Sequence, residues 1–80
     1  MMPFDMEINA NEFKEKKLKV LASVPLKVIV KDETGKLVKE FDTQPSQMLY
    51  DLAFLTAEMV VEVHLIPGNP VEFYPVVNAI

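Results

Sequence analysis

The segment from Leu26 to Phe41 constrains the fold of this chain more than any other. Leu26–Lys31 is rich in β-branched residues, and Leu37–Phe41 is a second run with strand character. Between them, Asp32 stands at the first position of a type I turn, and Gly35 supplies the left-handed conformation that closes it. These residues predict an antiparallel hairpin. The expected register pairs Asp32 with Lys36, Val30 with Val38 and Ile29 with Lys39.

Chain length and composition limit what can surround this hairpin. The 80 residues are half hydrophobic and one quarter charged, which is typical of one folded domain spanning residues 1–80. The absence of cysteine excludes disulfides, a thiol nucleophile and cysteine-ligated metals. A single histidine cannot form a multi-histidine metal site within one chain. We therefore expect no metal and no cofactor.

The charge distribution disfavours nucleic acid and membrane partners. The net charge is −4, the chain has no arginine, and its isoelectric point is near 4.8. An acidic chain without arginine lacks the usual means of attracting and gripping phosphates. Its uncharged apolar runs, such as Leu52–Ala57, are all far shorter than the ~20 residues that span a bilayer. Residues 1–5 lack the basic and apolar regions of a signal peptide, so we expect a cytoplasmic protein.

The N-terminal third has two interpretations beyond a first strand. Phe4–Ile8 alternates apolar and acidic residues, as a half-buried strand does. Asn9 and Glu12 then have the spacing of a capping box, which favours a helix within residues 10–24. The alternative is a strand over Lys17–Val24 that turns every second residue inward.

The C-terminal half predicts a central helix followed by a second hairpin. Pro45 suits the first position of a helix that runs to about Met59. Val60–Ile66 alternates like a strand, Pro67-Gly68-Asn69-Pro70 reads as a type II turn, and Val71–Val77 is expected to close the hairpin. Pro75 cannot donate to a ladder, which places that last strand at an edge. We expect residues 78–80, at the end of the chain, to be frayed.

The expected fold class is therefore α+β. It consists of a small, mostly antiparallel sheet of two hairpins around a central helix, a ββαββ core, with a strand and a helix at the N-terminus. The Thr34-Gly35 hairpin, the Pro45-Ser46 spacer and the helix after it resemble the opening of a ubiquitin-like β-grasp domain over residues 26–60. The chain lacks the Gly-Gly end with which carriers of that family are conjugated, so the resemblance implies no carrier role.

Hydrophobic excess on the expected helix points to a binding surface. Its apolar arc spans about 200° or more, wider than one sheet face covers. Methionine and aromatic side chains are also enriched at protein interfaces. The sequence thus predicts a non-catalytic interaction or assembly module that binds a protein partner or forms a dimer or larger homo-oligomer. The candidate interface is Met48, Tyr50, Phe54, Leu55 and Met59.

A catalytic or ligand-binding role is the alternative. His64 is the one side chain with an ordinary pKa near neutrality, and Glu62 lies two residues away on the same face of the expected strand. Together they could form a base and the group that orients it. No serine or threonine sits in a recognisable nucleophile motif, so an exposed strand residue is the simpler interpretation of His64.

Overall fold

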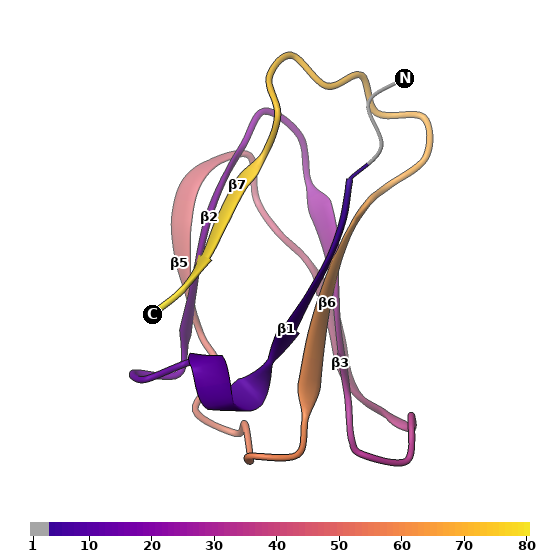
Figure 1. The fold of residues 1–80 in the computed structure, drawn as a ribbon. Coiled ribbons are helices and arrows are strands. Elements are labelled where there is room, and N and C mark those ends of the chain that lie inside the picture. The colour runs from indigo at the N-terminus through magenta and orange to yellow at the C-terminus, as the bar shows by residue number, and fades with distance from the viewer. Residues whose placement is uncertain (1–3) are drawn as a thin grey trace.

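The computed structural model describes residues 4–80 and shows two facing antiparallel sheets (Figure 1). Residues 1–3, which begin the segment where no signal peptide is expected, lie outside the described residues. One sheet has the order β1-β6-β3-β4 and the other the order β5-β2-β7. The strands are β1 (Asp5–Asn9), β2 (Lys17–Ala22), β3 (Leu26–Lys31), β4 (Leu37–Asp42), β5 (Ser46–Asp51), β6 (Val60–Leu65) and β7 (Val76–Ala79).

The core lies between the two sheets and follows the two-residue period of the strands. In β2, β3 and β6 every second side chain is buried, and the residues between them face solvent or the sheet surface. Leu52 and Leu55, from the loop between β5 and β6, close the core as well. The largest fully buried apolar side chains are Leu18, Leu26, Leu52, Leu55, Val20, Val28, Val30, Val61 and Val63.

The predicted α+β class is wrong, because no central helix forms. Residues 46–51, placed in the helix Pro45–Met59, instead pair with β2 as strand β5, and residues 52–59 form turns. Ser46 has a φ of 79°, which a helix beginning at Pro45 cannot contain. A strand partner in β2 outweighs the local helix preference of this segment.

The helix within residues 10–24 is also wrong, and the alternative strand is confirmed. The capping pair survives locally, because the Asn9 N–H donates to Glu12 Oε2 at 2.9 Å. It starts only a one-turn 3-10 helix, η1 (Ala10–Glu12). The chain then enters β2, which buries Leu18, Val20 and Ala22 completely. The capping box of Asn9 and Glu12 therefore correctly predicted where a helical turn begins but not how long it is.

The hairpin of β3 and β4 confirms the predicted turn. The Gly35 N–H donates to the Asp32 carbonyl at 3.0 Å, and Gly35 has a φ of 85°. Asp32 Oδ1 accepts hydrogen bonds from the Thr34 hydroxyl and from the N–H groups of Thr34 and Lys36. These bonds, above all the one from the Thr34 hydroxyl, hold the pKa of Asp32 below its ordinary value. Asp32 pairs with Lys36 as expected. The turn chemistry therefore acts as the sequence indicates.

The register beyond that turn is wrong by one residue. A bulge between Val30 and Lys31 pairs Val30 with Lys39 rather than Val38, and Ile29 with Glu40 rather than Lys39. A bulge adds one residue to one strand and shifts every later pair.

The C-terminal strands do not form the predicted second hairpin. Strand β6 and the positive φ of Gly68, 92°, are as expected. The expected strand Val71–Val77 is wrong over residues 71–75, and β7 (Val76–Ala79) pairs with β2 in the other sheet and not with β6. Its position at a sheet edge is confirmed. The expected fraying of residues 78–80 is wrong, because the Ile80 and Lys17 backbones exchange two hydrogen bonds of 2.9 and 3.2 Å.

A buried threonine joins two chain segments at the start of β3. Thr43 is 1% exposed, and its Oγ1 accepts the Leu26 N–H at 2.9 Å. The Thr43 N–H donates to the Leu26 carbonyl at 2.8 Å, so two hydrogen bonds join the two residues.

Segment 26–60, which resembles a β-grasp opening in sequence, contains strands and no helix, so nothing in it identifies a β-grasp. Within residues 4–80, no helix has the length and apolar character needed to cross a membrane.

Candidate interaction surface

The outer face of the three-stranded sheet carries exposed apolar side chains. In the register of β5, β2 and β7, Leu49 lies opposite Lys19, Leu21 lies opposite Val76, and the Ile80 backbone pairs with Lys17. Residues directly opposite each other share a face. Leu49 is 52% exposed and Val76 48% exposed. No other element described in the structure is paired to this sheet beyond its three strands.

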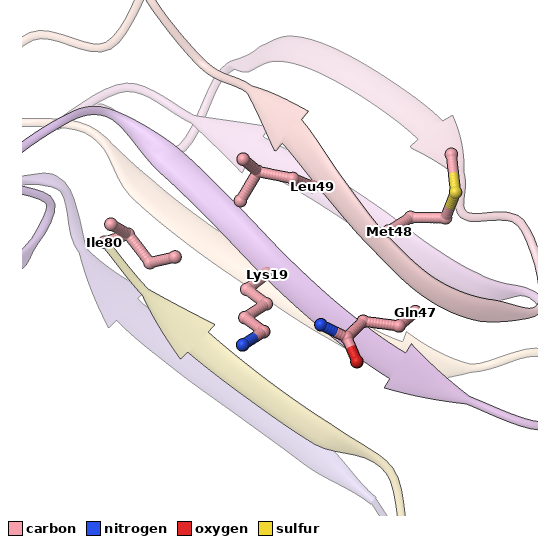
Figure 2. A pocket seen from close by; sticks show the side chains of 5 residues that line it. All are labelled: Lys19, Gln47, Met48, Leu49 and Ile80. Carbon is pink, nitrogen blue, oxygen red and sulfur yellow. The ribbon is translucent and has the colours of Figure 1, made fainter.

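A shallow pocket of about 360 Å³ lies on this face (Figure 2). Lys19 of β2 stands between Leu49 of β5 and Ile80 at the end of β7, and Gln47 lies beside it (Figure 2). The lysine stem adds apolar surface while its ammonium reaches solvent. The pocket lining therefore combines exposed apolar contact area with one cation and one amide, a mixture that suits a protein partner.

Strand β5 also presents an unpaired backbone edge. It lies at one end of its sheet, and the Leu52 N–H donates to the Lys16 carbonyl at 2.7 Å just beyond the strand. Opposite residues of an antiparallel pair alternate between bonded and non-bonded, so this bond fixes which β5 residues bond to β2. The remaining residues turn their N–H and C=O groups toward the open edge: Gln47, Leu49 and Asp51.

The five predicted interface residues are divided between surface and interior. Met48 and Phe54 are 40% and 36% exposed, whereas Leu55 is buried in the core. Met59 is half-buried, and its N–H donates to the Thr56 carbonyl at 3.0 Å. Tyr50 is half-buried, packs on Phe41 with ring centroids 5.5 Å apart, and its Oη accepts the Gln44 N–H at 2.6 Å. Met48 and Phe54 are therefore the members most open to a partner.

Sequence reasoning missed the residues that share the exposed sheet face. Leu49, Leu21, Val76 and Ile80 come from three strands, and two of those strands were not predicted as paired. The signal available was the alternation in residues 46–51, where Met48 and Tyr50 lie on one side and Gln47, Leu49 and Asp51 on the other. The helical interpretation of this segment concealed it.

His64 lies in a separate cluster on the outer face of the four-stranded sheet. Its Nε2 is 2.9 Å from Glu62 Oε1, so the structure brings the predicted pair together. Its Nδ1 is 2.6 Å from Asp5 Oδ1, a partner that the sequence did not reveal. Asp5 lies opposite His64 in the β1–β6 register, and Lys31 Nζ is 3.1 Å from Glu62 Oε2. The cluster borders a shallow pocket of about 230 Å³.

Both ring nitrogens of His64 are hydrogen-bonded to carboxylates, those of Asp5 and Glu62. The hydrogen bonds to Asp5 and then to Glu62 raise the pKa of His64 above its ordinary 6.5, and partial burial opposes this. The hydrogen bond to His64, and then that to Lys31, lowers the pKa of Glu62 below 4.5. A doubly protonated ring has no lone pair with which to accept a proton. This geometry makes His64 an ion-pair member that ties β1 to β6.

We expect His64 to make stability depend on pH. Its raised pKa contributes stability that is complete below pH 6.5 and is lost as the pH rises through the folded-state pKa. The lowered pKa of Glu62 acts in the opposite direction, with its contribution lost as the pH falls below 4.5. The cluster should therefore stabilise most between these values, by about 1 kcal/mol or less because it is partly exposed.

Urea unfolding of wild type and His64→Gln at pH 5.5 and pH 9 measures this effect. The free energy of unfolding should differ between the two proteins at pH 5.5 and converge at pH 9. An unchanged difference across that range would contradict the role of the charged ring.

Three hydroxyl groups that could serve as nucleophiles form structural hydrogen bonds instead. The Thr43 hydroxyl is buried on Leu26, the Thr34 hydroxyl donates to Asp32, and Ser23 Oγ accepts the Glu72 N–H at 3.2 Å. In the part of the chain that the structure describes, no group of three histidine or acidic side chains is placed to hold a metal ion. The outer face of the three-stranded sheet, by contrast, has three exposed apolar side chains, Leu21, Leu49 and Val76.

Comparisons with known proteins assign no function to this surface. The described residues form two sheets, and the outer face of the three-stranded sheet carries exposed apolar side chains. The chain matches no protein family, no curated protein and no solved structure.

Proposed function

We propose that this chain is a non-catalytic interaction module that binds another protein through β5 and the outer face beside it. The observation that carries the proposal is the coincidence of exposed Leu49 with an open backbone edge on the same strand. An extended partner strand can add to such an edge, with main-chain hydrogen bonds supplying affinity and flanking side chains supplying specificity.

The surroundings of β5 support a contact larger than one leucine. Met48 is exposed at the same edge, and Phe54 follows β5 in the chain with its ring 6.0 Å from Lys39 Nζ. Leu21 and Val76 extend the apolar area across the sheet. Soluble proteins rarely leave contiguous apolar area exposed without a use for it.

The second candidate, a catalytic or ligand-binding role of His64 and Glu62, has weaker support. The two residues are adjacent and border a shallow pocket. A general base needs a ring nitrogen free to take a proton, and both nitrogens of His64 are bound to carboxylates. For that reason the interaction role is the better account of the chain.

Leu49→Asp tests the proposal in a lysate of the cells that naturally contain the chain. Immobilised wild type should retain a partner that Leu49→Asp loses at least about tenfold, because a desolvated carboxylate opposes docking. Leu37→Asp is the matched control, since Leu37 is 53% exposed and lies on β4. Identical retention by wild type and Leu49→Asp would overturn the proposed role of this surface.

A further inference from the structure

The four edge strands differ in what they offer to a second strand. At the open edge of each, only alternate residues present free N–H and C=O groups, and side chains directly opposite each other must be compatible. The hydrogen bonds at the strand ends fix these alternate residues for β1, β4 and β5. The edges can therefore be compared residue by residue.

Acidic side chains occupy the open positions of β1 and β4. The Ala10 N–H bond to the Met59 carbonyl leaves Asp5 and Glu7 facing outward from β1. The two hydrogen bonds between Thr43 and Leu26 leave the backbone groups of Glu40 and Asp42 facing outward from β4. Two copies joined at either edge would set like charges opposite each other, a standard protection against edge pairing.

The edge of β7 is short and is preceded by a proline. β7 has four residues, and Pro75 directly before it supplies no N–H. Natural proteins use short strands and prolines to protect edges from pairing. β5 also follows a proline, Pro45, and has Asp51 at one open position. It is longer than β7, however, and unlike β1 and β4 it has an exposed apolar side chain, Leu49, at the centre of its open edge.

Self-pairing of β5 has one register that uses its whole open edge. With Leu49 opposite Leu49 of a second copy, Gln47 faces Asp51 across the twofold axis. All three open residues of each copy then exchange hydrogen bonds, and the Gln47 amide can donate to the Asp51 carboxylate. Moving the axis to Met48 places Pro45, which has no N–H, opposite Asp51. The Leu49 register is therefore the best that this edge allows.

We propose, as an extension that rests on the function proposed above, that the partner on β5 is a second copy of this chain. Two copies pair antiparallel at Leu49 and join their three-stranded sheets into one continuous six-stranded sheet. Met48 of each copy lies opposite Tyr50 of the other, and the exposed apolar outer faces become contiguous. The contact is isologous and closes as a dimer, because the same edge is used once by each copy.

Sedimentation velocity of the purified chain across the micromolar range tests the pairing. Wild type should move from monomer to dimer with rising concentration. Leu49→Asp and Leu49→Lys should each weaken the dimer at least about tenfold, because like charges meet at the axis. An equimolar mixture of these two variants should associate again, since opposite charges then face each other. Leu37→Asp should dimerise as wild type does.

Three outcomes would overturn the second-copy proposal. These are a wild-type monomer throughout that range with an intact circular dichroism spectrum, equal dissociation by Leu37→Asp, and an Asp–Lys mixture that stays monomeric. The lysate experiment separates this failure from failure of the proposed function. A Leu49-dependent partner other than the chain itself would retain the function and exclude the self-pairing.

Discussion

Replacing Leu18 by alanine should destabilise the protein by between about 2 and 5 kcal/mol. Leu18 is fully buried in β2, at the centre of the three-stranded sheet, and its side chain faces the other sheet across the core. Truncation removes buried apolar contact and leaves a cavity that the neighbouring strands fill only in part. A chain of this size has roughly 4–12 kcal/mol of stability, so much of it would be lost.

Leu21→Ala is the matched control for that substitution. Leu21 lies in the same strand but on the outer face, 36% exposed, and its truncation should cost less than about 1 kcal/mol. Urea unfolding followed by circular dichroism measures both variants. Equal losses from the two substitutions would contradict the assignment of Leu18 to the interior face of a strand, and with it the two-sheet fold.

Thr43→Val should destabilise the protein by about 1–3 kcal/mol. Valine has nearly the shape of threonine, but it cannot accept the buried Leu26 N–H that Thr43 Oγ1 now satisfies at 2.9 Å. A buried donor left without a partner bears its full desolvation penalty. The bond also fixes the end of β4 against the start of β3, so its loss should show as faster amide exchange at Leu26.

Thr56→Val provides the comparison for Thr43. Thr56 is exposed in the loop after β5, so the same chemical change there should alter stability by less than about 0.5 kcal/mol. Thermal unfolding of both variants, with hydrogen exchange at Leu26, distinguishes the two sites. A Thr43→Val protein as stable as wild type, with unchanged exchange at Leu26, would show that the bond is dispensable.

Local patterns predicted the parts of the fold that local chemistry determines. The turn around Gly35, the strand at residues 60–65 and the edge position of the strand after Pro75 depend on neighbours in the sequence, and each is confirmed. The segment at residues 46–51 is different, because its strand conformation depends on β2 as a partner. A lone segment containing methionine, leucine and alanine favours helix, and only the pairing reverses that preference.

The candidate surface could be predicted only in part, for the same reason. Met48 and Phe54, predicted from the apolar excess, are exposed, but Leu55, in the loop after β5, is buried in the core. The predicted helix Pro45–Met59 gave no reason to select Leu49, which lies in strand β5. The contact of His64 with Asp5 depends on the pairing of β1 with β6, which no spacing in the sequence indicates. Partners that are distant along the chain therefore account for most of what was missed.

The strand order has a consequence for how the chain acquires its structure. β1 has its partner in β6, and β2 has one of its two partners in β7, so neither sheet is complete until nearly the whole chain is available. Closing such long loops before any pairing is gained slows folding, as it does in other proteins dominated by distant contacts. Until then, the apolar runs of β2 and β3 have no opposite sheet to cover them. The interval between synthesis and closure is when this small protein is most exposed to wrong pairings.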